Sequence, residues 1–415
     1  MAAMRSRAFR FSLLFGLAAT EMMPVALMTQ AMPILMRRSG ASLQAIGILS
    51  LVLLPRALKV LWAPIVDKLG AGSRFGRYRG WLLGLHALLI ITLLLGAFAD
   101  VPALLTTESA VGIPALLWLT IVSATADTAS HGLAVNLLAP EERGVGNGLQ
   151  SSGMMLGNLV GGGLLVMLVD KVGWKPALLC MAGCILVPLP GVLLYEERPV
   201  DAQKRISPGE LFSFFKRSRI HRWLALLAIM AIGPTLIDIC LPTLLVDRGY
   251  SLSEIGFVMG VITSLSGAAG GAFGGLVVKR LGRERAFYAL TILCSLCLAS
   301  TLLTRMATSR ALLYAGLTLP YFGVVARSTL IYAMVMDRSR GHVASTDFTL
   351  QVTVVQVSGF LGLGLGSVVA EHFGPVAVFI LAPVLTLTAL FAAKRLFGSR
   401  DFDANQAQDL APFQG

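Results

Sequence analysis

The sequence predicts an all-α integral membrane protein with twelve transmembrane helices, arranged as two parallel six-helix halves. Three observations lead to this fold class. The composition is apolar, with 56% hydrophobic and 13% charged residues in a chain of 415. Long apolar stretches recur about twelve times along the chain. Short motifs of the first half also reappear in the second half at a nearly constant offset.

The composition excludes most classes of soluble protein. A soluble chain carries about 25% charged residues, which is nearly twice the fraction found here. The net charge of +12 would suit nucleic-acid binding, but the basic residues are dispersed between apolar stretches and form no single patch. We therefore expect the membrane to surround the chain, and we expect no nucleic-acid partner.

The apolar stretches have the length of membrane-spanning helices. About 20 residues span a bilayer as a helix, whereas the strands of a membrane barrel are shorter and alternate in polarity. The chain begins like a signal peptide, but its first apolar run is too long for one, so we expect an uncleaved first span. The twelve expected spans lie near 11–36, 42–66, 80–99, 111–138, 147–169, 176–195, 222–246, 253–278, 287–304, 310–334, 347–370 and 375–396.

The distribution of basic residues predicts which ends of the spans are cytoplasmic. The N-terminus, the even-numbered connections and the C-terminal tail hold 24 of the 34 Lys and Arg residues, whereas the odd-numbered connections hold 7. The positive-inside rule then places both termini in the cytoplasm. The expected units are a first bundle over 1–196, a cytoplasmic linker over 197–221, a second bundle over 222–396 and a cytoplasmic tail over 397–415.

Several motifs indicate that spans 7–12 repeat spans 1–6. Gly40–Gly47 is matched by Gly249–Gly256, and the loop that begins at Asp67 is matched by Lys279–Arg285. Further matches at offsets of about 200 to 212 are Pro24 with Pro234, Pro33 with Pro242, and Leu149-Gln150 with Leu350-Gln351. Several matches in one register indicate a repeat of six helices in the same orientation. Parallel repeats of this kind place a binding site near the membrane midplane, between the halves.

Two sequence blocks carry a resemblance to a known family. They are Leu58–Asp67 followed by Gly76–Leu83, and Ala124–Asp127 followed by Pro140–Gly144. Both resemble the muropeptide permease group of the major facilitator superfamily, which also includes acetyl-CoA transporters and the rhizobactin- and pyochelin-type siderophore permeases. The resemblance covers nearly all of the first half and, more loosely, the second. It implies the major facilitator fold.

The branch within this group depends on a few positions. Muropeptide permeases tend to carry a second carboxylate four residues after the first one in span 4, where this chain has His131. The segments Gly132–Val135 and Thr29–Pro33 are closer to the siderophore permeases. The resemblance therefore implies import of a ferric siderophore of the pyochelin or rhizobactin kind. The alternative is a permease for anhydromuropeptides or another proton symporter for small anions.

Arg56 is the residue most expected to contact the substrate. Its distance from Asp67 along a helix places it near the middle of the hydrocarbon core, where a charge costs about 3 kcal/mol unless it faces a cavity or a partner. A guanidinium suits carboxylate, phenolate or phosphate oxygens, and the alternative is an internal salt bridge to Glu21 or Asp127.

Five further residues complete the expected substrate site. Lys59 can instead snorkel to the lipid surface, and Arg327 can instead lie at a helix end and not on the wall opposite Arg56. For the aromatic members of the set, packing is the alternative to stacking on substrate rings. The five are Lys59, Arg327, Gln30, Trp62 and Tyr321.

Buried titratable groups suggest proton coupling. Asp127 and His131 are spaced i,i+4 on one helix face and can share a proton. Glu21 and Asp238 are the other expected proton carriers, because burial favours the uncharged form of a carboxyl group. For Glu21, static neutralisation of Arg56 is the alternative.

Two kinds of residue are expected to serve gating. Asp67, Arg77 and Arg79 surround a basic loop that can latch one half against the other, although plain positive-inside topology explains the basic residues as well. Pro24 and Pro234 can kink spans 1 and 7, whose ends must move in alternating access.

These observations together predict a proton-driven importer of the bacterial inner membrane. The sequence lacks a Gly-rich Lys motif for ATP and a His-Glu-x-x-His motif for metal-dependent catalysis. We therefore expect a transporter and not an enzyme, with no cofactor and no metal site. The five cysteines lie in apolar spans and are expected to pack. The expected partners are the ferric siderophore and a proton, and the expected state is a monomer.

Overall fold

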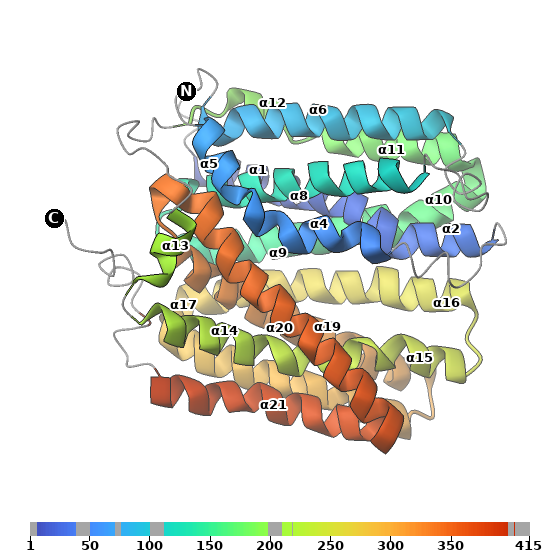
Figure 1. Cartoon of the computed structure of the whole chain (residues 1–415). Helices are drawn as coiled ribbons and strands as arrows, with labels where there is room; N and C mark the ends of the chain where they lie inside the picture. The colour runs from blue at the N-terminus through green and yellow to red at the C-terminus, as the bar shows by residue number, and fades with distance from the viewer. Residues whose placement is uncertain are drawn as a thin grey trace.

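The computed structural model places the described part of the chain in helices (Figure 1). It describes residues 6–38, 50–70, 76–99, 112–197, 210–217, 219–396 and 402. Ten segments of these residues are long and apolar enough to cross a membrane. One of them, Glu254–Met306, turns at Gly282, whose φ of 74° lies in the left-handed region, and so supplies two spans. The broken helix over Ser50–Gly70 completes twelve, which confirms the predicted fold class.

The first half consists of six spans, several of which are interrupted by a π-helical or 3₁₀ turn (η). The elements are α1 (Arg7–Ala26), η2 (Leu27–Ala31), α2 (Met32–Arg38), η3 (Ser50–Leu53), α4 (Leu54–Leu58), η4 (Lys59–Leu61), α5 (Ala63–Gly70), α6 (Arg77–Phe98), α8 (Gly112–Leu137), α9 (Arg143–Leu159), η5 (Val160–Leu164), α10 (Leu165–Val172), α11 (Trp174–Leu186) and α12 (Leu189–Leu194).

The second half repeats this plan after a short helix in the linker. The elements are the linker helix α13 (Glu210–Phe215), then α14 (Ile220–Thr235), η6 (Leu236–Asp238), α15 (Cys240–Asp247), α16 (Leu252–Gly256), η7 (Phe257–Ile262), α17 (Thr263–Ala299), η8 (Ser300–Leu302), α18 (Leu303–Met306), α19 (Arg310–Asp337), η9 (Gly341–Val343), α20 (Ala344–Phe373) and α21 (Pro375–Leu396).

The two halves meet at one end of the bundle and part toward the other. We call the end at which α1 begins and α21 ends the proximal end, at the left of Figure 1, and the opposite end the distal end. One hydrophobic cluster, which includes Leu14, Tyr78 and Phe348, joins both halves on the proximal side. On the distal side each half has a cluster of its own, around Met28 in the first and Leu241 in the second.

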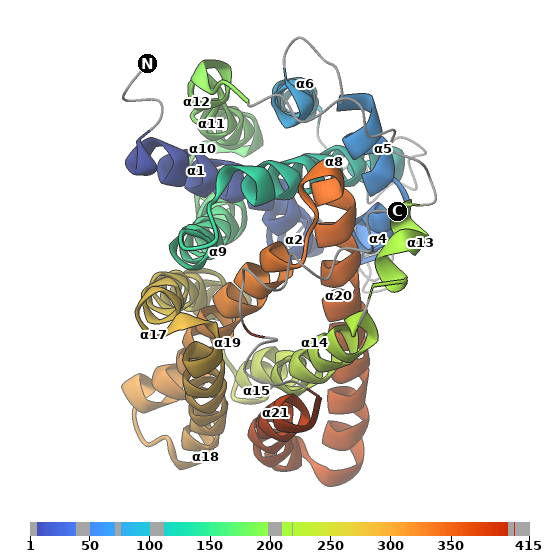
Figure 2. The same cartoon turned by 90° about the vertical axis from the view of Figure 1, so that its left-hand side faces the viewer.

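The course of α20 shows this divergence most clearly. Its first turn contacts α5 and α8 of the first half, while its later turns pack on α14 and η6 of the second half. In Figures 1 and 2 the distal end of α20 lies beside α21 and away from α4. At α20 the halves therefore meet at the proximal end and not at the distal end.

Glycines give both halves the same close contact between two helices. In each half, a Cβ added at a glycine would come within 2.5 Å of a carbonyl oxygen, so only glycine allows the helices to approach this far. The distances from the added Cβ are 2.1 Å for Gly157 with Ala19, 2.2 Å for Gly161 with Met23, 2.5 Å for Gly362 with Ile232, and 2.3 Å for Gly366 with Leu236. In this register, Pro234 corresponds to Glu21 and not to Pro24, which the sequence motifs had matched.

Candidate functional site

Asp127 is the centre of a buried cluster of charges in the first half. It lies in the middle of α8, and two cations reach it from the broken span before α6. The Lys59 ammonium donates to Oδ2 of Asp127, and Arg56 Nη2 lies 3.6 Å from Oδ1. His131, one helical turn further along α8, places Nε2 3.4 Å from the same Oδ1. The Asp127 carboxylate thus contacts two cationic side chains and a histidine.

The local sequence explains why the cations point inward. Pro55 begins α4, which lasts one turn before the chain tightens into the 3₁₀ turn η4 at Lys59. This break lets Arg56 and Lys59, three residues apart, both face α8. The Lys59 side chain is only 2% exposed, so the predicted snorkelling to the lipid surface is wrong. A buried ammonium is stable there because Asp127 compensates its charge.

Arg56 is held less tightly than Lys59. Its contact with Asp127 is long, its side chain is 16% exposed, and its buried Nη1 has no hydrogen-bond partner in the described residues. The predicted alternative of an internal salt bridge to Asp127 is therefore present, but it leaves part of the guanidinium free. Glu21 is buried and interacts electrostatically with Asp127, Arg56 and Lys59, while its Oε1 has no partner in the same part of the chain.

His131 connects this cluster to the second half. Its ring stacks on Phe348 of α20, with ring centroids 4.2 Å apart and an interplanar angle of 20°. Tyr332 of α19 lies beside both rings, at 6.3 Å from His131. A residue that contacts the central carboxylate thus also packs against the helix on which the two halves diverge.

Asp67 fastens the start of α20 to the first half. Its carboxylate accepts hydrogen bonds from the backbone N–H of Ser345 at 3.2 Å and of Thr346 at 2.8 Å, and from the Thr346 hydroxyl at 2.6 Å. The Tyr78 hydroxyl donates to the same carboxylate at 2.6 Å. A negative charge at a helix N-terminus satisfies free N–H groups and the helix dipole. The side chain predicted for gating therefore joins the halves at the proximal end.

Further polar contacts close the same end. Arg77 Nη1 donates to the His342 carbonyl at 2.7 Å, as expected for a latch between the halves. Arg143 of α9 and Arg283 of α17 both pair with Asp337, at 3.0 and 2.9 Å. The sequence interpretation missed this triad, although Arg143 lies in one of the family blocks and Arg283 in the repeated basic loop. Arg79 instead bonds the Leu193 carbonyl within the first half.

The remaining predicted substrate residues lie in three different places. Gln30 donates to Asn158 Oδ1 at 2.8 Å, and Asn158 donates to Ser264 Oγ at 3.0 Å, a polar chain between the halves that the sequence interpretation missed. Trp62 is half-buried and donates to Thr125 Oγ1 at 3.1 Å, two residues before Asp127 along α8. Tyr321 packs against the distal cluster of the second half.

Two second-half residues are not brought to the Asp127 cluster. Arg327 is buried in α19 and donates to the Met230 carbonyl on α14. The side chain of Asp238 is accessible, because the turn η6 buries Leu236 and Ile237 and leaves the third residue outside, but it is surrounded by protein atoms and interacts electrostatically with Tyr321. Pro24 lies inside α1 just before the π-helical turn η2, and Pro234 lies inside α14 just before η6.

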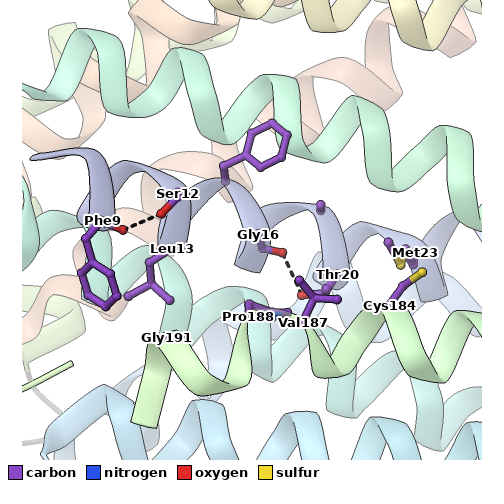
Figure 3. A pocket seen from close by; sticks show the side chains of 12 residues that line it. Phe9, Ser12, Leu13, Gly16, Thr20, Met23, Cys184, Val187, Pro188 and Gly191 are labelled. Carbon is purple, nitrogen blue, oxygen red and sulfur yellow. Dashed lines mark hydrogen bonds between the residues drawn. The ribbon is translucent and has the colours of Figure 1, made fainter. Parts of the chain in front are cut away.

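A separate groove of about 420 Å³ lies between α1 and the α11–α12 segment (Figure 3). Figure 3 shows apolar side chains such as Leu13, Val187 and Pro188 along it, with the Thr20 hydroxyl bonded to the Gly16 carbonyl. It contains no charged side chain and none of the Asp127 cluster. We therefore assign the candidate site to the Asp127 cluster, a buried set of charges in the first half that contacts the second half through His131.

Comparison with known proteins identifies the family. The sequence pattern of the Major Facilitator Superfamily matches residues 14–363. The anhydromuropeptide permease of Escherichia coli (strain K12) is 29% identical over 294 residues, which are 68% of this chain and 58% of that relative. The chain thus spans well under two thirds of that relative's length. A putative transporter AmpG 4 of Rickettsia felis is 21% identical over 403 residues, 92% of this chain and 95% of the relative.

Solved structures show the same fold. The human organic anion transporter MFSD10 superposes with a TM-score of 0.68 at 16% identity, over 93% of this chain and 99% of that chain. The proton:xylose symporter XylE has a TM-score of 0.68 at 14% identity, over 99% and 98% of the two chains. Because the sequence match covers most of its length and the fold agrees, the chain belongs to the Major Facilitator Superfamily.

Proposed function

We propose that this transporter imports an anionic solute together with a proton, and that the solute is an anhydromuropeptide or a close chemical relative. The observation that carries the proposal is the loose hold of Asp127 on Arg56, the more exposed of its two cationic partners. Two permanent cations share one carboxylate, and the more loosely held one, Arg56, keeps an unpartnered Nη1. In a membrane interior such a group needs a further anionic partner.

Asp127 occupies the position that a substrate carboxylate would take against Arg56. A guanidinium binds carboxylate groups well because its N–H groups match their geometry. An arriving anion would pair with Arg56 in place of Asp127, while the charge of Lys59 continues to neutralise that of Asp127. This exchange costs less than exposing an unpaired charge, because the arriving anion gives Arg56 a close partner in place of its long contact with Asp127.

A proton can enter the same cluster. Asp127, His131 and Glu21 are buried titratable groups, and the first two contact each other at 3.4 Å. A proton taken up by Asp127 would weaken its hold on both cations and on His131. Because His131 stacks on Phe348, that change would reach α20, the helix that fastens the two halves. We therefore propose that protonation of the site changes the contacts of α20 that close the proximal end.

The charge asymmetry of the connections suggests how the protein is oriented in the membrane. We propose that the proximal end, which carries the excess of Lys and Arg, faces the cytoplasm. The closed proximal end and parted distal end then correspond to an outward-facing state of a monomeric transporter in the bacterial inner membrane. Asp67, Arg77 and the Arg143–Asp337–Arg283 triad are the contacts that must break for the site to open inward.

The choice of substrate class rests on the named relatives. The sequence motifs favoured a ferric siderophore, but the two relatives described above are named an anhydromuropeptide permease and a putative transporter AmpG 4. A muropeptide carries peptide carboxylates, which suit the guanidinium of Arg56. We therefore prefer the anhydromuropeptide to the siderophore, which stays the second candidate for the same anion site.

The test is uptake by a strain that lacks its own muropeptide permease. Cells that express the chain should accumulate a labelled anhydromuropeptide, and collapse of the proton gradient should abolish that accumulation. Cells that express Arg56→Met at the same protein level are the matched control. Accumulation of ferric pyochelin but not of the muropeptide would restore the siderophore assignment, and uptake that survives loss of the gradient would refute proton coupling.

A further inference from the structure

The seventh span is broken at Pro234, and the carbonyl groups around the break are satisfied in an unusual way. Proline has no N–H, so Pro234 leaves the carbonyl of Met230, four residues earlier, without its helical hydrogen bond. The Thr235 hydroxyl donates to the carbonyls of Ala231 and Ile232, at 3.2 and 3.0 Å. The Leu236 N–H closes the helix on the Gly233 carbonyl.

Arg327 supplies the donor that Pro234 removes. Its Nη2 reaches from α19 and donates to the Met230 carbonyl. The side chain is buried, and its Nε and Nη1 have no hydrogen-bond partner in the described residues. Burying a guanidinium in an apolar bundle for one hydrogen bond is costly. If the only role of Arg327 were to bond the Met230 carbonyl, a residue with a backbone N–H at position 234 could do so at a lower cost in free energy.

The break is also the point at which α20 packs most closely against the seventh span. Gly362 and Gly366 of α20 lie against the carbonyls of Ile232 and Leu236, on either side of Pro234. On another face, a Cβ at Gly233 would meet Thr386 of α21, 2.5 Å from its Oγ1. The first turn of the same α20 is held by Asp67 and stacked on by His131. Movement of α20 at the proximal end is thus transmitted directly to the break.

We propose that Arg327 is a positioning residue of the transport cycle, which holds the Pro234 break as a hinge between α14 and α15. A side chain from another helix can keep the Met230 carbonyl satisfied while the break changes its angle, whereas a backbone N–H would fix the helix. In this view Arg327 stabilises the arrangement of the halves seen here, in which it bonds the Met230 carbonyl, and so sets the balance of conformations and not the binding of substrate. The proposal depends on alternating access but not on the identity of the solute.

The experiment measures the hinge without any substrate. Spin labels are attached at Lys171→Cys and Glu371→Cys, two exposed positions near the distal ends of α10 and α20, in a chain without its native cysteines. The distance distribution in proteoliposomes reports the distal-open and distal-closed populations. The chain with native Arg327 is compared with Arg327→Met and Arg327→Lys, and with Arg310→Met as a matched control at the exposed start of α19.

A second variant separates a hinge from a structural bond. When Arg327→Met is combined with Pro234→Ala, the backbone N–H that the second substitution restores can bond the Met230 carbonyl, so the protein should fold as stably as the native chain. We expect Arg327→Met alone to lower the distal-open population about tenfold, the factor for one lost hydrogen bond to a charged group. The double variant should show a single narrow population and a maximal transport rate that stays about tenfold low, with an unchanged half-saturation constant.

Three results would overturn the proposal. An unchanged distance distribution in Arg327→Met would show that the hinge does not need the guanidinium. Full recovery of the distance distribution and the transport rate in the double variant would show that Arg327 only satisfies a carbonyl. A raised half-saturation constant with an unchanged maximal rate would place Arg327 on the substrate. Failure of the labelled muropeptide to be transported would leave the distance measurement, and this proposal, unaffected.

Discussion

The two halves of the transporter share their packing but not their charges. Asp127 and Arg327 each lie ten residues before the end of their helices, at Leu137 and Asp337, so they occupy equivalent positions of the repeat. The register of the glycine contacts likewise pairs Glu21 with Pro234. Where the first half places two carboxylates, the second half places a cation and a helix break.

This difference suggests a division of labour. The first half contains the titratable cluster that we propose to bind the anion and the proton. The second half contains the broken span that we propose to bend. The glycine–carbonyl contacts are retained in both halves because close approach of two helices tolerates only glycine, whereas the charges are free to diverge.

The largest expected effect comes from removing the shared carboxylate. Asp127→Asn deprives Lys59 and Arg56 of the carboxylate that they contact directly, so the free energy of unfolding should fall by about 3–5 kcal/mol. Adding Lys59→Met should restore most of this loss, because a neutral pair replaces a broken ionic one. Denaturant unfolding in detergent measures both variants. An Asp127→Asn variant as stable as the native chain would show that the cations do not depend on Asp127.

Loss of the looser cation should affect binding more than folding. Arg56→Met should raise the half-saturation constant for an anionic solute about 10- to 100-fold, the range for a hydrogen bond to a charged group. Its thermal stability should stay near that of the native chain, because Asp127 keeps Lys59. Uptake kinetics test the expected rise in the half-saturation constant, and a melting curve tests the expected stability. A large loss of stability with unchanged affinity would make Arg56 a structural residue.

The shared packing of the halves can be tested with matched glycine variants. Gly366→Ala and Gly161→Ala each bring a Cβ to within 2.3 Å of a carbonyl oxygen, so each should destabilise the protein by about 1–3 kcal/mol. Gly364→Ala, whose added Cβ has no atom within 4 Å, is the control and should be neutral or slightly stabilising. The melting temperatures of the three variants decide the matter. Equal melting temperatures would contradict the close contacts.

The smallest expected effect concerns the proximal closure. Asp67→Asn keeps one carbonyl oxygen as an acceptor, but the N–H groups of Ser345 and Thr346 bond different oxygens of Asp67, so one of these bonds is lost together with the negative charge at the start of α20. The closed state should lose about 0.5–1 kcal/mol, so the proximal end should open several-fold more often. Labelling of a cysteine placed behind this contact, from the cytoplasmic side, measures the change. Labelling at the native rate would show that the charge contributes nothing to closure.

The spans, the repeat and the proximity of Asp127 to His131 could be predicted from the sequence because they depend on local spacing. The contact of Lys59 with Asp127 could not, since it depends on how two helices cross. The exposure of Asp238 depends on a 3₁₀ turn that hydrophobicity does not reveal. The missing N–H of Pro234 is visible in the sequence, but Arg327, which satisfies the Met230 carbonyl in its place, lies 97 positions from that carbonyl along the chain.

The central claim is that Arg56 recognises the solute by binding a negatively charged group on it. The most direct measurement compares uptake into proteoliposomes of a labelled anhydromuropeptide and of its carboxamide, in which the carboxylates are neutral, by the native chain and by Arg56→Met. The account predicts that the native chain transports the acid at least about tenfold faster than the amide, and that Arg56→Met removes most of this preference. Equal transport of acid and amide by the native chain, or an unchanged preference in Arg56→Met, would contradict it.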